Sequence, residues 1–115
     1  MPKEWQRFAK FFAALGDTTR QQILLVFEPG EEICVNEIAR LFSLSRPAIS
    51  HHLKVLRDAE LLTCEKRGKE VYYRVNAAHC AGVLETVYRF VASNRQSPNE
   101  QSSDVVPTER NPVPV

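Results

Sequence analysis

The side chains best suited to binding chemistry in this sequence lie on one side of a single predicted helix. They combine positive charge, a hydroxyl and an imidazole: Arg46, Pro47, Ser50, His51 and Lys54. Arginine pairs with the O6 and N7 atoms of guanine, and short polar side chains fit the major groove of a DNA duplex. This face is therefore typical of a helix that lies in that groove, although an ordinary solvated surface helix carries a similar face.

The residues around this face predict the turn and second helix of a helix-turn-helix over 41–56. Ser45 is a good N-cap, and Pro47 is tolerated in a first helical turn. Ile49, Leu53 and Leu56 recur at helical spacing and predict the apolar side that packs on the rest of the domain.

The sequence leaves more than one possible role for each polar side chain on this helix. Arg46 is our leading reader of bases, and a phosphate contact is its alternative. Ser50 and His51 lie one turn further on and can reach base edges or phosphates. We expect Lys54 to contact phosphates. His52 adjoins the apolar side, so packing or hydrogen bonding within the protein suits it better than base reading.

The elements that must position this helix follow from apolar spacing, caps and breakers. The pattern predicts helices over 5–15, 17–27 and 35–42, the helix that ends near 59, and a last helix from Asn76 to about Asn94. Residues 33–35 are short and β-prone. Two further β-prone runs, 61–66 and 70–75, flank a Gly-containing connection, which predicts a hairpin. Its tip carries Lys66, Arg67 and Lys69, which suits contact with phosphates but also a solvated tip.

Composition and charge fit a single small domain with a basic centre. The net charge is +1, but residues 43–76 hold seven basic and four acidic side chains, a local balance of +3. No apolar run is long enough to span a membrane, and the N-terminus lacks a signal-peptide pattern, so we expect a cytoplasmic protein. In that compartment Cys34, Cys64 and Cys80 are expected to be reduced thiols.

Four segments together resemble the ArsR-type (ArsR/SmtB) winged helix-turn-helix repressors. Residues 14–20 (ALGDTTR) are similar to the family's "LgDptR" opening, with Thr18 in place of Pro, and residues 32–38 are similar to its "ELcVcdL" segment. Residues 45–56 (SRPAISHHLKVL) resemble its recognition helix, and residues 68–74 (GKEVYYR) resemble its wing. The resemblance implies a mostly α, α+β winged helix-turn-helix with a two-stranded wing, whose first and last helices form a homodimer interface. The aromatic-rich first helix and the broad apolar stripe of the last helix agree with such an interface.

Family members commonly release DNA when a metal, a metalloid or a thiol oxidant binds, but this chain departs from the family's metal sites. Cys34 stands at the first cysteine of the sensing segment, and Asn36 replaces the second. A single thiolate is a poor site for a soft ion. Of the family's zinc ligands on the last helix only His79 is kept. Glu60 replaces a glycine that follows the recognition helix in many members, which costs on the order of 1 kcal/mol if this residue adopts a positive φ.

The thiols therefore keep more than one interpretation. Cys34 is either a small cap or packing residue or a sensor thiol, whose pKa a helix N-terminus would lower. A three-thiol site that joins Cys34, Cys64 and Cys80 would suit arsenite, but they belong to three different elements. His79 is more often a surface residue of a first turn than a metal ligand. No cofactor is predicted, and the inducer stays unknown.

We conclude from the sequence that residues 1–94 form a DNA-binding and dimerisation domain and that residues 95–115, which are rich in Pro and Ser, form a disordered tail. We expect a homodimeric repressor that binds an inverted-repeat operator in double-stranded DNA. The alternative is a winged-helix module that binds protein and not DNA. No pattern typical of a catalytic site is visible, so we do not expect an enzyme.

Overall fold

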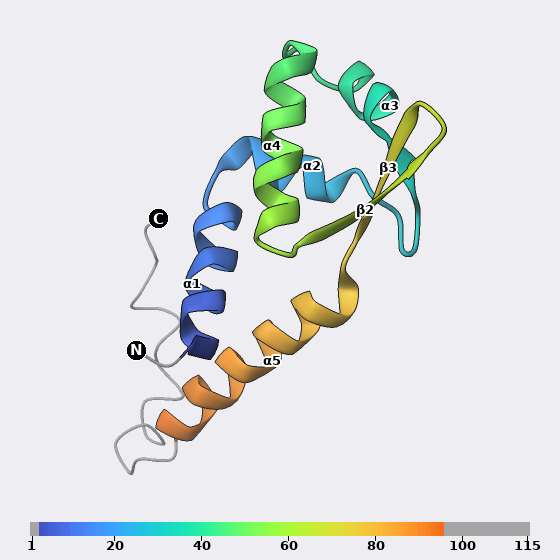
Figure 1. Ribbon diagram of the computed structural model, residues 1–115. Coiled ribbons are helices and arrows are strands. Elements are labelled where there is room, and N and C mark those ends of the chain that lie inside the picture. The colour runs from blue at the N-terminus through green and yellow to red at the C-terminus, as the bar shows by residue number, and fades with distance from the viewer. Residues whose placement is uncertain (1–2, 96–115) are drawn as a thin grey trace. The chain divides into compact units, whose positions relative to one another are not determined.

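The computed structural model describes residues 3–95, in which five helices and three strands follow one another (Figure 1). By their internal contacts the described residues fall into two units that divide after residue 81, and the last helix begins in the first unit and continues into the second. The predicted tail lies outside the described residues, apart from residue 95. Within residues 3–95 we find no helix with the length and apolarity that a membrane span requires.

Two helices open the first unit. Helix α1 (Lys3–Leu15) buries Phe8, Phe11 and Ala14, which follow one another at helical spacing. Helix α2 (Thr18–Leu25) starts where predicted, because the Asp17 carboxylate accepts a hydrogen bond from the Arg20 backbone N–H at 3.1 Å. It ends two residues before the predicted Phe27 as the backbone tightens into a turn.

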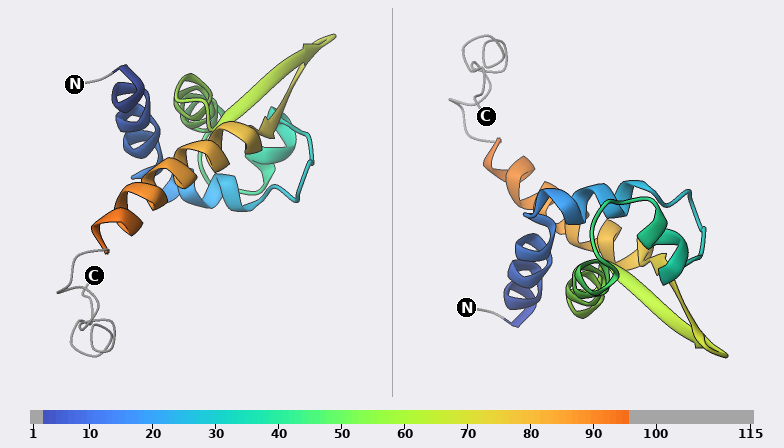
Figure 2. Two further views of the ribbon diagram at one scale, coloured as in Figure 1. Left: turned by 90° about the horizontal axis from the view of Figure 1, so that it is seen from below. Right: turned by 90° about the horizontal axis from the view of Figure 1, so that it is seen from above.

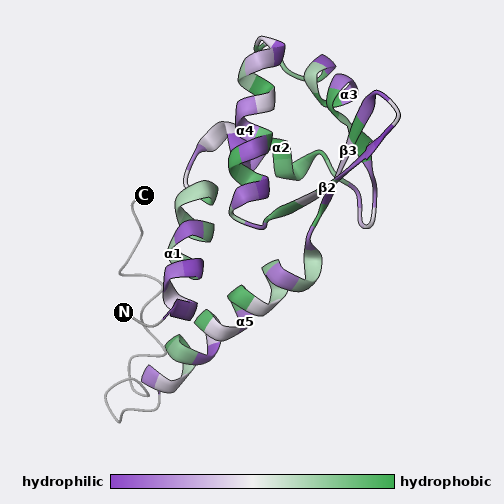
Figure 3. Ribbon diagram, viewed as in Figure 1, coloured by the Kyte–Doolittle hydropathy of each residue, from purple (hydrophilic) through white to green (hydrophobic). Residues whose placement is uncertain are grey.

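The helix-turn-helix consists of α3 (Val35–Arg40) and α4 (Arg46–Asp58). Helix α3 is shorter than predicted, because the N–H groups of Leu41 and Phe42 bond to carbonyls three residues back instead of four. Ile49, Leu53 and Leu56 of α4 are fully buried, which confirms the predicted apolar side. Hydrophobic and hydrophilic residues both occur along α4, as Figure 3 shows.

The sheet is larger than the predicted hairpin. Strands β2 (Leu62–Arg67) and β3 (Glu70–Val75) form that hairpin, and Gly68 provides the positive φ of its turn. A third, two-residue strand, β1 (Ile33–Cys34), pairs antiparallel with β3, so the order is β1-β3-β2. Figure 2 shows the hairpin extending beyond α2, α3 and α4 of the same unit.

The last helix, α5 (Ala77–Asn94), begins and ends where the sequence predicts. The Asn76 side-chain oxygen accepts a hydrogen bond from the His79 backbone N–H at 3.3 Å, which confirms Asn76 as its cap. In the second unit, Leu84, Tyr88 and Val91 follow at spacings of four and three, and all three are more than half exposed. They therefore form an apolar stripe along one side of this helix.

Candidate nucleic-acid interface

Helix α4 separates its apolar and polar residues onto opposite sides. Arg46, Pro47, His51 and Lys54 are exposed, and Ser50 is partly buried at the edge of this polar side. Ser45 starts the helix, and its hydroxyl accepts a hydrogen bond from the Ala48 backbone N–H at 3.2 Å. Because the opposite side is fully buried, the orientation of the polar side is fixed by the core.

The cations of α4 differ in how they are paired. In residues 3–95 Arg46 makes no ion pair, whereas Lys54 lies 3.2 Å from Asp58 one turn further along. Arg57 also pairs with Asp58, at 3.0 Å. These two cations, Arg57 first, hold the pKa of Asp58 below its usual range. The start of α4 therefore keeps a positive charge without an ion pair, whereas the two cations at its end share one carboxylate.

His52 has a role inside the protein. It is partly buried, and its Nδ1 lies 3.3 Å from Nη1 of Arg20, whose Nε donates to the Ala14 carbonyl at 2.7 Å. Because a guanidinium only donates hydrogen bonds, Nδ1 can only act as the acceptor in this contact. This contact confirms the prediction that His52 hydrogen-bonds within the protein.

On the wing, the three predicted cations have different surroundings. Lys66 and Lys69 are exposed and, among the described residues, have no ion pair. Arg67 instead donates hydrogen bonds to Glu32 and Glu65, and its guanidinium carbon lies 4.8 Å from the centre of the Tyr72 ring. Sequence reasoning missed this cluster, because Glu32 is 35 residues from Arg67 and only the pairing of strands brings them together.

The three cysteines lie in different environments. Cys34 is buried at the start of α3, Cys64 is exposed, and the Cys80 thiol is partly buried, which raises its pKa. Cys34 pairs with Tyr72 across the sheet and Cys64 pairs with Tyr73, so the two thiols lie on opposite faces. In the described part of the chain no three His, Cys, Asp or Glu side chains are grouped to hold a metal ion.

His79 contacts protein groups instead of standing free in solvent. Its Nδ1 lies 3.5 Å from Nη2 of Arg7, and its ring meets the edge of Phe11 at a centroid distance of 6.0 Å. Arg7 in turn donates to both carboxylate oxygens of Glu60, at 2.8 and 2.6 Å. His79 therefore belongs to a cluster that joins α1 to the turn after α4.

Comparison with known proteins decides the family. Residues 17–63, which include the helix-turn-helix, match the model of the bacterial regulatory protein arsR family. The chain is 32% identical over 80 residues to the transcriptional repressor SdpR of Bacillus subtilis, an alignment that covers 70% of this chain and 88% of that one. This protein belongs to the ArsR family.

Solved structures agree with this assignment. An ArsR-like transcriptional regulator from Rhodococcus sp. RHA1 superposes with a TM-score of 0.76 at 27% identity, over 91% of this chain and 97% of that one. A homodimeric winged helix-turn-helix DNA-binding domain from Mycobacterium bovis gives a TM-score of 0.63 at 25% identity, over 83% and 86% of the two chains. The ArsR-family chain described here is accordingly a DNA-binding transcriptional regulator with a winged helix-turn-helix, and not an enzyme.

Proposed function

We propose that this protein represses transcription in the bacterial cytoplasm by binding an inverted-repeat operator with two copies of α4. The observation that carries this proposal is the division of α4 into a fully buried apolar side and an exposed side with Arg46, His51 and Lys54. Such a helix can enter the major groove without uncovering its core. Arg46, Pro47, Ser50 and His51 would face the bases, and Lys54, Lys66, Arg67 and Lys69 the phosphates.

A homodimer would supply the second copy of α4. The similar domain from Mycobacterium bovis is homodimeric. On α5, the exposed stripe of Leu84, Tyr88 and Val91 is apolar surface of the kind that a subunit covers. On α1, Phe12 is 39% exposed beside the buried Phe11. We place the dimer interface on these two helices.

The test is a fluorescence-anisotropy titration of the protein with duplex DNA from upstream of its own gene, repeated over a range of salt concentrations. Affinity should fall as salt rises, with a slope of about 0.9 per phosphate contacted. Arg46→Ala should weaken operator binding more than binding to a scrambled duplex. Lys54→Ala should weaken binding to both duplexes equally and lower the salt slope by about 1. Lys3→Ala removes a positive charge outside α4 and the wing and serves as the control.

The same titration tests the alternative of a protein-interaction module. Absence of binding, or binding that ignores salt, would favour that module and contradict the proposal. If Lys3→Ala loses as much operator affinity as Arg46→Ala, binding depends only on the overall charge of the protein. This result would contradict the proposal that α4 reads the operator.

We propose further that a metal, a metalloid or a thiol oxidant releases the DNA, with Cys34 as the candidate sensor thiol; the alternative is that Cys34 is only a small cap or packing residue. Its position at the start of α3 supports the sensor role, because a distortion there would shift the helix that precedes α4. Operator binding should be titrated with and without arsenite, zinc, cadmium and peroxide. Cys34→Ser should lose the response to the active agent, while Cys64→Ser, on the opposite face of the sheet, should keep it. A Cys34→Ser protein that responds like its parent would exclude Cys34.

A further inference from the structure

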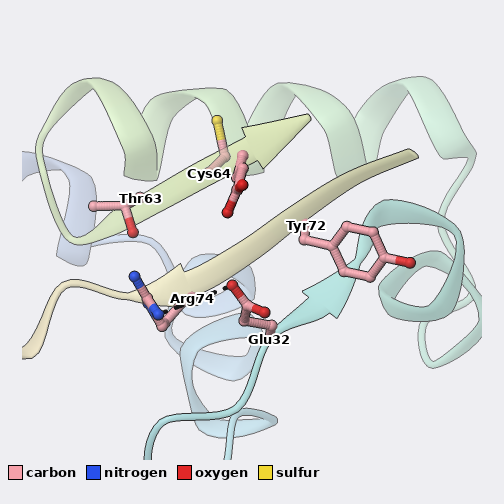
Figure 4. A pocket seen from close by; sticks show the side chains of 6 residues that line it. Glu32, Thr63, Cys64, Tyr72 and Arg74 are labelled. Atoms are coloured by element: carbon pink, nitrogen blue, oxygen red, sulfur yellow. Dashed lines mark ion pairs between the residues drawn. The ribbon is translucent and has the colours of Figure 1, made fainter. Parts of the chain in front are cut away.

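One face of the sheet carries a cluster of paired charges. Alternate residues of a strand share a face, so Arg67 of β2 lies on the same face as Tyr72 and Arg74 of β3. Glu32, which directly precedes β1, reaches this face from the other edge of the sheet. Glu32, Tyr72 and Arg74 border an open pocket of about 360 Å³, which is also lined by Thr63, Cys64 and Glu65 (Figure 4).

The Glu32 carboxylate contacts two arginines at once. Nη2 of Arg67 lies 2.8 Å from Oε2 and 3.0 Å from Oε1 of Glu32. Nη1 of Arg74 lies 3.9 Å from the same Oε2, and Figure 4 shows the two side chains pointing toward each other. Glu32 is also the least exposed acid of the cluster, with 29% of its side chain accessible against 63% for Glu65. The carboxylate thus occupies the place where the two guanidinium groups converge.

A guanidinium binds carboxylate and phosphate in the same way, through parallel N–H donors to two oxygens. A site that holds a carboxylate between two arginines is therefore also shaped for a phosphate. The guanidinium carbon of Arg67 lies 4.8 Å from the centre of the Tyr72 ring, a cation–π contact that helps to hold this side chain in place. Pairing with Glu65 and Glu32 raises the pKa of Arg67 further above its already high ordinary value.

We propose that Arg67 and Arg74 form a binding site for a backbone phosphate of the operator, and that Glu32 occupies this site when DNA is absent. The inference rests on the proposed function, since it concerns a contact with the same DNA. Glu32 swings into solvent when the phosphate enters. The acid therefore competes with DNA, and the affinity of the wing for the duplex is set by Glu32 as well as by the cations.

Two variants with the same change of charge test this competition. Glu32→Gln removes the competing carboxylate. Glu28→Gln removes a negative charge from the same loop, where the exposed Glu28 side chain has no ion pair among residues 3–95. In the salt titration with operator duplex, Glu32→Gln should bind about three-fold more tightly than Glu28→Gln, which is within the range that exposed ion pairs contribute. Thermal melting of both variants checks that each is folded.

Removing the arginines should abolish this difference. In a chain that carries both Arg67→Ala and Arg74→Ala, the Glu32→Gln and Glu28→Gln changes should affect the affinity equally. Arg67→Ala and Arg74→Ala together, with no other change, should lower the salt slope by about 0.9, since the one phosphate contact of this site is lost. This second readout does not depend on any substitution of Glu32.

The outcomes separate this inference from the function on which it rests. Suppose that the unaltered protein binds operator with a normal salt slope but that Glu32→Gln and Glu28→Gln have the same operator affinity. The proposed phosphate site is then wrong, while the proposed function as a DNA-binding repressor is retained. The same holds if the gain from Glu32→Gln survives in the double arginine variant. If the unaltered protein does not bind duplex DNA, both proposals fail.

Discussion

Glu60 adopts a backbone conformation that side chains seldom tolerate, with a φ of 67°. Its carboxylate accepts two hydrogen bonds from Arg7, a residue 53 positions earlier. Glu60→Ala and Glu60→Gly both lose these bonds, but only glycine relieves the left-handed conformation. We expect the free energy of unfolding of Glu60→Gly to exceed that of Glu60→Ala by about 1 kcal/mol in urea denaturation. Equal values would show that this backbone conformation is not costly.

Single residues also mark the limit of what sequence can predict. The place of Glu60 after the recognition helix, where the family resemblance implies a glycine, is enough to suggest a positive φ. Its partner Arg7 cannot be foreseen, because an ion pair between distant residues depends on the packing of whole helices. The ion pair between Glu32 and Arg67 is likewise not predictable from the sequence. A side chain that caps a helix, such as Asp17, acts over only three residues, and its role is predictable from the local sequence.

Asp17 links stability to pH. The Arg20 backbone N–H bonds to its carboxylate and is the largest cause of a lowered pKa in the folded protein. A carboxyl whose pKa is lower when folded stabilises the protein above its unfolded pKa, about 3.9 for Asp, and this contribution is lost as pH falls through the folded value. Asn also caps helices but does not titrate. Between about pH 5 and about pH 2 the melting temperature of Asp17→Asn should therefore fall less steeply than that of the parent. Parallel pH profiles would contradict this.

At the scale of elements, the start of α4 depends on one hydroxyl. Ser45 satisfies the Ala48 N–H, which has no partner within the helix. Ser45→Ala should lower the free energy of unfolding by about 1 kcal/mol. It should also weaken operator binding, because Arg46 and Pro47 lie in the first turn that loses its cap. Ser45→Asp retains an N-cap and controls for stability, and melting curves give the comparison. Unchanged stability in Ser45→Ala would show that solvent replaces the hydroxyl without cost.

Elements with strong local signals are predictable from the sequence, and the weakest one is not. The helices α4 and α5 combine apolar periodicity with an N-cap residue, and α1 shows apolar periodicity; the predicted bounds of all three agree with the structure to within two residues. The hairpin is indicated by Gly68 between two β-prone runs. The third strand, β1, has two residues and carries no periodicity. Its pairing with β3 is a long-range event, so the β-propensity of residues 33–35 does not identify a partner strand.

At the scale of the whole molecule, operator affinity should depend on the second subunit. Tyr88 is 61% exposed in the middle of the apolar stripe of α5. Tyr88→Glu would bury a charge at the proposed interface, which is costly without a partner. We expect this variant to sediment as a monomer and to lose most of its operator affinity. Glu85→Gln on the same helix, outside the stripe, should stay dimeric. A dimeric Tyr88→Glu protein would place the interface elsewhere.

Two copies of α4 also impose a spacing on the DNA. In helix-turn-helix dimers the recognition helices enter successive major grooves about 34 Å apart, which corresponds to roughly 10 base pairs. Inserting about 5 base pairs, half a helical turn, between the half-sites moves one of them to the opposite side of the duplex, so only one subunit can then bind specifically. We expect anisotropy titrations to show affinity close to that of a single half-site. Inserting a full turn of about 10 base pairs returns both half-sites to the same side of the duplex but increases the distance between them. A rigid dimer should therefore not regain its operator affinity. Full recovery with the full-turn insertion would mean that the subunits are joined flexibly, and unchanged affinity with the half-turn insertion would mean that each subunit reads DNA alone.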